Sequence, residues 1–287
     1  MRVKAAFAAL ATSLRGERQS VDCSSSVAAA PPATIFDSVE ARGFLDASNG
    51  DERQAVALFE AKREWERTTS GRSMRRIAPF LRSEGYVVCL EGSYDNEGRP
   101  VVFSNGMAHG TAEEVMQQVS YAHERVIAQC ERLERPLRAT TVVNVRNPTF
   151  RFPDGPLRSA IEMTDARYPW VGLGRTIFVG FPRPVRYVFE SLRVFMSQSF
   201  YDSIEFADDA AALADIVPLD GLPADALCGA TSDGEFDINA YIRERLRAEA
   251  GEAGAPPEAD DDDDDDAEQV RSYAGKRLDL RLFDSLR

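Results

Sequence analysis

The chain has 287 residues, of which 44% are hydrophobic and 28% are charged, so it can bury a normal core in one large domain or two small ones. Its formal net charge is −13, and part of that charge is one uninterrupted run, Asp260 to Asp266, so the rest of the chain is only mildly acidic. This balance argues against broad binding to nucleic-acid phosphates, which needs clustered Lys and Arg.

The N-terminal residues 1–34 are expected to form a disordered leader. They are rich in Ala and Ser and carry Arg2, Lys4, Arg15 and Arg18 against few acids. This composition weakly resembles a targeting segment, so organelle targeting stays open as an alternative. No apolar run approaches the length of a membrane span.

Helical periodicity dominates residues 35–84. The turn signal Asn49-Gly50 precedes Asp51, which can cap a helix, and apolar residues then recur at helical spacing up to Trp65. A second short helix is predicted from Arg72 to Arg82. We interpret these residues as a small N-terminal helical lobe.

Strands and helices then alternate. The runs Tyr86–Leu90 and Arg99–Gly106 flank a turn and read as a hairpin or as two adjacent strands. The elements predicted next are a helix from Glu113 to Glu134, a buried strand from Thr140 to Val145, a helix from Pro156 to Tyr168 and a buried strand from Arg175 to Phe181. Strand–helix–strand at this spacing predicts a right-handed parallel crossover.

An amphipathic helix is predicted from Pro184 to Met196, with Arg186 and Arg193 on its polar side. A strand from Ile204 to Phe206 and a helix from Ala210 to Ile216 follow. Residues 238–287 are expected to hold a charged helix up to Ala250, an Asp-rich linker and a C-terminal tail.

Enzyme motifs are missing where they would be expected. VGLGRT (171–176) lacks a third glycine and precedes a strand, whereas a phosphate-binding turn follows one. The sequence has no GxxxxGK[ST], GxSxG or HExxH. The four cysteines have no zinc spacing and are expected to be reduced thiols, and the two histidines, His109 and His123, are too few to favour a metal site. His123 is expected to be a partly exposed helical residue. We therefore predict no catalytic residue and no metal.

The order of several separated segments resembles the CRAL-TRIO lipid-binding family. The matching segments are Phe44-Leu45, Trp65, Arg99-Pro100-Val101-Val102, Tyr168-Pro169, Leu173-Gly174, Thr176–Val179, Phe195, Leu222-Pro223 and Gly229. Two positions depart from the pattern: Gly180-Phe181-Pro182 replaces Asn-Ala-Pro, and Ala230 replaces a second glycine. The resemblance covers Phe36 to Asp237.

The resemblance implies an α/β fold with a mixed, largely parallel sheet as the floor of a lipid cavity, preceded by the helical lobe. The implied domains are 1–34 as leader, 35–84 as lobe, 85–237 as lipid-binding domain and 238–287 as charged helix, linker and tail. The helix 184–196 would be a movable gate. Its hinge would comprise Gly180, Pro182 and Pro184.

The resemblance also suggests which residues contact the ligand. Those expected to line the cavity are Phe103, Val143, Val145, Phe178, Phe181, Val185, Phe189 and Leu192. Those suggested for the head group are Thr149, Arg151 and Thr164, although simple surface or packing polarity explains them equally well. Trp170 stands where the phosphoinositide-binding branch has an acid, and Ser203 where it has Lys, which argues against phosphoinositide binding.

The expected function is binding of one hydrophobic molecule, a phospholipid above all, and its exchange between membranes without catalysis. The bound lipid is the sole cofactor expected, and the location expected is the cytoplasm, in transient peripheral contact with membranes. One alternative is a lipid-sensing adaptor that recruits a protein partner through the acidic C-terminal tail. Another is a small-molecule enzyme on an α/β fold, which a polar cleft with a perturbed titratable pair would support.

Overall fold

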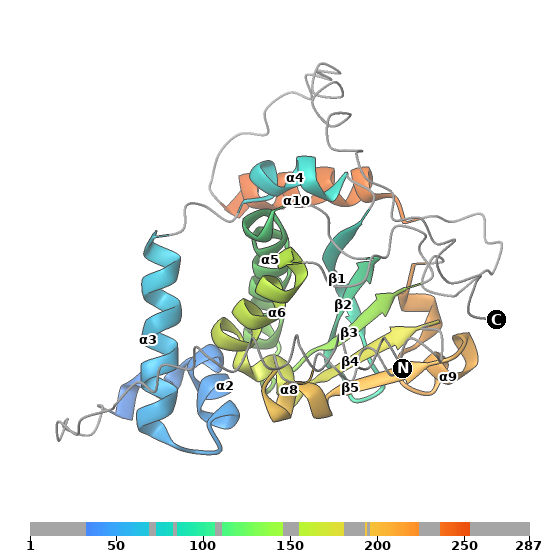
Figure 1. Ribbon diagram of the computed structural model, residues 1–287. Coiled ribbons are helices and arrows are strands. Elements are labelled where there is room, and N and C mark those ends of the chain that lie inside the picture. Colours follow the sequence, from blue (N-terminus) through green and yellow to red (C-terminus); the bar gives the residue numbers. More distant parts are fainter. Residues whose placement is uncertain are drawn as a thin grey trace, which may run out of the picture. The chain divides into compact units, whose positions relative to one another are not determined.

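The computed structural model describes residues 33–68, 73–82, 85–106, 111–145, 155–180, 193, 196–223 and 236–252 (Figure 1). All of them belong to the unit Pro31–Arg287. In these ranges, no helix combines the length and the apolar character needed to cross a membrane.

A five-stranded mixed sheet organises this unit, with its strands in sequence order (Figure 1). The strands are β1 (Tyr86–Tyr94), β2 (Pro100–Asn105), β3 (Thr140–Asn144), β4 (Arg175–Val179) and β5 (Ile204–Ala207). β1 and β2 pair antiparallel, and each later neighbour pairs parallel. The antiparallel pairing of β1 with β2 confirms that these two strands are neighbours, and the parallel pairing of β3 with β4 confirms the predicted parallel crossover, whose right hand stays a prediction.

Where the structure describes a predicted helix, the helix is present with its ends within three residues of the predicted ones, whereas the predicted helix 184–196 lies almost wholly outside the described residues. The helices around the N-terminal half are η1 (Ala33–Asp37), α2 (Val39–Ala47), α3 (Glu52–Thr68), α4 (Met74–Leu81), α5 (Ala112–Arg132) and α6 (Gly155–Arg167). The later ones are η2 (Pro169–Leu173), α8 (Gln198–Asp202), α9 (Ala210–Ala214), η4 (Leu219–Gly221) and α10 (Ile238–Glu252). Asp51 does cap α3: its Oδ1 accepts the Gln54 N–H at 3.1 Å.

The two faces of the sheet pack against different helices. On one face, Phe103, Val142 and Ile177 join a core that contains Leu81 of α4 and Ile242 of α10. We call this the α10 face. On the other, Cys89 and Val102 join Ala122 and Val126 of α5, and the Gln129 amide donates to Cys89 Sγ at 3.0 Å. We call this the α5 face.

Helix α10 contributes to the core although the predicted boundary at 237 sets it apart. Ile242 is 1% exposed and Arg245 4%. The Glu249 carboxylate accepts the Met74 N–H, at 3.0 and 3.1 Å from its two oxygens, and the Tyr121 hydroxyl at 2.7 Å. The charged pattern of α10 therefore includes groups that bond α4 and α5.

A buried lysine joins the N-terminal helices to the rest of the fold. Lys62 of α3 is 1% exposed, and its Nζ pairs with Glu40 of α2, with Glu66 at 2.6 Å and with Glu124 of α5 at 3.1 Å. Burial alone would lower the pKa of Lys62, but the charges of Glu124 and Glu40 raise it above its ordinary value. Burial raises the pKa of Glu40 in spite of its bond to Lys62.

The glycines of VGLGRT allow close packing. A Cβ on Gly174 would clash with the Ala139 carbonyl oxygen, and one on Gly172 would lie 2.8 Å from the Phe200 amide nitrogen. These contacts let η2 pass close to the start of β3 and to α8. No side chain larger than hydrogen fits at either position without moving backbone.

Candidate ligand-binding site

The α5 face of the sheet continues past α5 as an apolar surface over β3, β4 and β5. Side chains alternate across a strand, so residues in register on neighbouring strands share a face. Val143 pairs with Phe178, and Phe178 pairs with Phe206. The rings of Phe178 and Phe206 stack with centroids 5.8 Å apart. This row is the candidate floor of a hydrophobic site.

Three of the cavity residues predicted from sequence lie together on this face. Val143, Val145 and Phe178 are 6%, 8% and 8% exposed. Phe206 of β5 completes their row, although it was missing from the predicted set. Simple alternation from Ile204 would have found it, once the register with β4 was known.

Phe103 lies on the opposite face, so the prediction that it shares a cavity wall with Val143 and Phe178 does not hold. It pairs with Val142, and its ring meets Tyr86 edge-on at 6.2 Å within the α10-face core. The cause is the strict alternation of side chains along β2 and β3. A ligand on the α5 face is separated from Phe103 by the backbone of the sheet.

Much of the predicted gate and head-group set lies outside the described residues. These positions are Phe181, Val185, Phe189, Leu192, Thr149, Arg151, Pro182 and Pro184. Gly180 of the predicted hinge is described: its φ of +73° is a conformation that glycine adopts without strain, and its N–H donates to Ala207 O at 2.9 Å.

The far end of the same connection is fixed on α6. The Ser197 amide and hydroxyl both donate to the Asp165 carboxylate, each at 2.7 Å. Arg193 is exposed, and its guanidinium lies over the Tyr201 ring at 4.9 Å while donating to Gln198 at 2.7 Å. Gly180 at the β4–β5 edge and Ser197 on α6 therefore hold described positions on either side of the predicted gate in the sequence.

The remaining predicted head-group residue, Thr164, packs between two helices. It is 8% exposed, and its hydroxyl lies 3.9 Å from Met116 Sδ of α5. Beside it in the α5–α6 contact are Val119 and Met163. The Thr164 hydroxyl therefore points toward α5.

One polar group on the α5 face was missed by the sequence reasoning. Thr176 pairs in register with Thr141 and Ile204, one row from Phe178. It is 6% exposed, and its hydroxyl oxygen has no hydrogen-bond partner in the described part of the chain. The sequence does not reveal that this hydroxyl is unpartnered. Most buried threonine hydroxyls form a hydrogen bond, and whether one is available depends on the tertiary structure.

Trp170 and Ser203 both have structural roles. Trp170 is fully buried, and its ring meets the His123 ring at 5.3 Å. Ser203 is 6% exposed and donates its hydroxyl to Phe200 O at 2.7 Å. Neither residue offers a charge to a phosphorylated inositol.

His123 is buried, so the prediction of a partly exposed residue is wrong. It is 5% exposed between Tyr168 and Trp170, and its ring centroid is 4.7 Å from that of Tyr168. Burial, together with the positive charge of Lys62, lowers the pKa of His123 to about 3. A histidine that stays neutral inside a packed cluster has a structural role.

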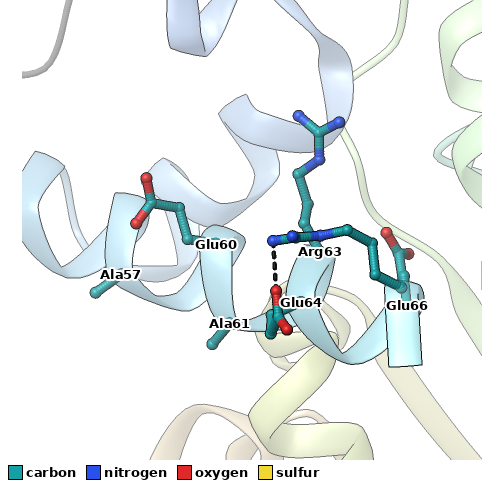
Figure 2. A pocket seen from close by; sticks show the side chains of 7 residues that line it. Ala57, Glu60, Ala61, Arg63, Glu64 and Glu66 are labelled. Atoms are coloured by element: carbon teal, nitrogen blue, oxygen red, sulfur yellow. Dashed lines mark ion pairs between the residues drawn. The ribbon is translucent and has the colours of Figure 1, made fainter. Parts of the chain in front are cut away.

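A different hollow lies on α3 and is polar (Figure 2). Its lining residues are Ala57, Glu60, Ala61, Arg63, Glu64, Glu66 and Arg67. Two of these lining residues, Glu64 and Arg67, form an ion pair 2.5 Å long in which both side chains are more than half exposed. The charges of this hollow make it unsuited to a hydrocarbon chain, in contrast to the row at Val143, Phe178 and Phe206.

Comparison with known proteins gives one family match. The model of the CRAL/TRIO domain matches residues 83–226, half of the chain. A solved structure entitled "Crystal structure of Sfh5" is 11% identical, over 74% of this chain and 81% of that one, with a TM-score of 0.49. No curated protein matches the chain.

Proposed function

The chain belongs to the CRAL/TRIO domain family, and from that premise we propose that it binds one phospholipid in an apolar cavity on the α5 face and exchanges it between membranes. Membership implies binding of a lipid or another small hydrophobic molecule. Proteins of the family are generally lipid-binding and lipid-transfer proteins rather than enzymes. The observation that carries the finer proposal is the row formed by Val143, Phe178 and Phe206.

The row suits acyl chains because its side chains are apolar and two of them, Phe178 and Phe206, are stacked aromatic rings. Moving about 30 methylenes from water into hydrocarbon gains on the order of 24 kcal/mol, at about 0.8 kcal/mol each. When a lipid moves from a bilayer into such a site, the transfer free energy of its acyl chains changes little, because both environments are hydrocarbon. The site would therefore remove the aqueous barrier and leave exchange reversible.

Topology supports a gate on the same side of the sheet. The strands lie in sequence order and β2 to β5 are parallel, so right-handed connections between successive strands would all cross the same face of the sheet. The connection from β2 to β3 contains α5, which packs on the α5 face, so that is the face expected for the connection from β4 to β5 as well. The connection from Gly180 to Ser197 contains the predicted gate 184–196 and would cross above Phe178 and Phe206. Its fixed ends at β4–β5 and α6 would let the middle move as a flap.

The head group of the lipid needs polar partners at one end of the site. Thr149 and Arg151 are the residues we propose for the head group, Arg151 through a charge-assisted bond to phosphate. Thr164 is a weaker proposal, because its hydroxyl is directed toward Met116. Phosphoinositides are disfavoured, because Trp170 and Ser203 are buried structural residues.

The proposal is tested by loading and transfer. Lipid extracted from the purified chain is identified by mass spectrometry, and transfer of fluorescent phosphatidylcholine between vesicles is then followed. Leu192→Glu should slow transfer at least about tenfold, since a charge on the apolar gate face opposes its insertion into hydrocarbon. Leu133→Glu is the matched control, because Leu133 of the α5 C-terminus is 38% exposed and should tolerate the charge.

Two outcomes would count against the proposal. Equal transfer by the two variants would argue against the gate. Absence of lipid and of transfer in the unaltered chain, together with capture of a partner through residues 238–287, would favour the adaptor.

A further inference from the structure

Gln118 of α5 is a buried amide without a hydrogen-bond partner in the described part of the chain. Its side chain is 0% exposed, and both Nε2 and Oε1 are unpartnered there. Most buried polar side chains bond to the protein or to an ordered molecule, and an unbonded one loses the hydration of its polar atoms without compensation. This amide is therefore a candidate contact for a molecule that the fold receives.

The side chain of Gln118 faces the sheet. Ala122 and Gln129, about one and three turns further along α5, lie on the same side of the helix. Ala122 packs in the core of the α5 face, and the Gln129 amide donates to Cys89 Sγ at 3.0 Å. Gln118 continues this sheet-facing line toward the start of α5.

The start of α5 lies toward the carboxyl ends of the parallel strands. α5 connects β2 to β3, which pair in parallel, so it runs back from the C-terminal end of β2 to the N-terminal end of β3. Val143 and Val145 lie at the C-terminal end of β3 and just past it. On this face α5 packs on Cys89 of β1 and Val102 of β2. Gln118 therefore stands at the side wall of the proposed site, beside its apolar floor.

A trapped water satisfies Gln118 less well than a ligand would. Val115 and Ala122, its neighbours one turn away on the sheet-facing side, are apolar. On the facing strand β2, the Ser104 hydroxyl already donates to Gly106 O at 2.7 Å. A buried water needs two to four polar partners. A mainly hydrocarbon molecule with one polar group needs only the amide, and it can cover the apolar surroundings as well.

We propose that Gln118 binds an uncharged hydroxyl of the lipid that occupies the site on the α5 face. The amide donates through Nε2 and accepts through Oε1, so a complementary group must do both. A hydroxyl does so, whereas a phosphodiester only accepts and a choline ammonium does neither. Burial also favours an uncharged group. The inference rests on the proposed function, and it narrows the ligand to lipids with a hydroxyl close to their hydrocarbon chains, such as diacylglycerols.

Competitive loading from vesicles tests the inference. The delipidated full chain is mixed with phosphatidylcholine vesicles that contain equal amounts of 1,2-dioleoylglycerol and its 3-O-methyl ether, and is then re-isolated. Mass spectrometry measures how much of each of the three lipids is bound to the protein. The ether has no hydroxyl proton and would leave Oε1 unbonded. We expect bound diacylglycerol to exceed bound ether about tenfold, the ratio that one hydrogen bond of ordinary strength gives.

Gln118→Leu should bring this ratio to about one, because it replaces the amide with an apolar side chain of similar size. The fall should lie in bound diacylglycerol and not in bound ether. Gln118→Met should behave in the same way, so that the result does not depend on how one side chain packs. Gln117→Leu is the matched control: Gln117 is 6% exposed, its amide donates to Glu113 at 3.3 Å, and its variant should keep the tenfold ratio.

Several results would overturn the inference and leave the proposed function standing. They are equal binding of diacylglycerol and ether by the unaltered chain, phosphatidylcholine as the sole bound lipid, an equal fall of both test lipids in the Gln118 variants, and loss of the ratio in Gln117→Leu as well. Loss of the ratio in Thr176→Val but not in Gln118→Leu would assign the hydroxyl to Thr176, whose unpartnered oxygen lies on the same face. Absence of all three lipids would reject the proposed function together with the inference.

Discussion

Replacing Lys62 with Met should cost about 3 to 4 kcal/mol of unfolding free energy. The change keeps the length of an unbranched side chain and removes a charge that is 1% exposed. It leaves Glu40, Glu66 and Glu124 facing one another with side chains 19%, 24% and 33% exposed. Breaking a buried pair typically costs about 3–5 kcal/mol, and partial solvation of the acids places this case in the lower half of that range.

The sign of the pH dependence follows from the raised pKa of Lys62. Its stabilising contribution is complete below its unfolded pKa and is lost only as pH rises through the folded value, so it is fully present at neutral pH. In Lys62→Met the loss should be smaller at pH 5 than at pH 7, because Glu40, whose pKa is already raised by burial, can take up a proton.

Urea unfolding at both pH values measures these effects. Arg67→Met on the same helix is the control: its pair with Glu64 is exposed, 73% and 60%, so its loss should stay below about 0.5 kcal/mol. Adding Glu40→Gln to Lys62→Met should recover part of the loss. Equal losses for the Lys62 and Arg67 variants would refute the idea of a buried charge network.

Three further changes test other parts of the fold. Burial lowers the pKa of His123 to about 3 while the unfolded histidine titrates near 6.5, so stability should fall by about 1.4 kcal/mol per pH unit as pH drops below 6.5. In His123→Phe, the unfolding free energy measured in urea should depend less steeply on pH between pH 7 and pH 5. An unchanged pH dependence would mean that His123 is solvated. Thr176→Val should raise the stability of lipid-free protein by about 1 kcal/mol, because it removes an unpartnered buried hydroxyl. A lower melting temperature would show instead that this hydroxyl is bonded. Gly174→Ala should cost about 1–3 kcal/mol, since its Cβ would meet the Ala139 carbonyl. Gly251→Ala, with nothing within 4 Å, should cost nothing, and similar melting temperatures for the two glycine variants would contradict the close contact.

The sequence by itself determined the five strands and most of the described helices, in their order. Capping at Asp51, the apolar period of α5 and the β-branched runs of β3 and β4 are local signals, and each element formed within a few residues of its predicted bounds. The order of weak motifs also identified the family, because it records the spacing of elements and does not require any side-chain contact.

Only the tertiary structure decided which side chains meet. β2 is buried on both faces, so its sequence PVVFSN shows no polar alternation, and the register alone separates Phe103 from Val143 and Phe178. Lys62 and His123 look like surface residues of amphipathic helices. They are buried because partners from distant segments supply the carboxylates and rings that offset their desolvation. Contacts of this kind depend on how elements pack, and that information is not contained in any local stretch of the chain.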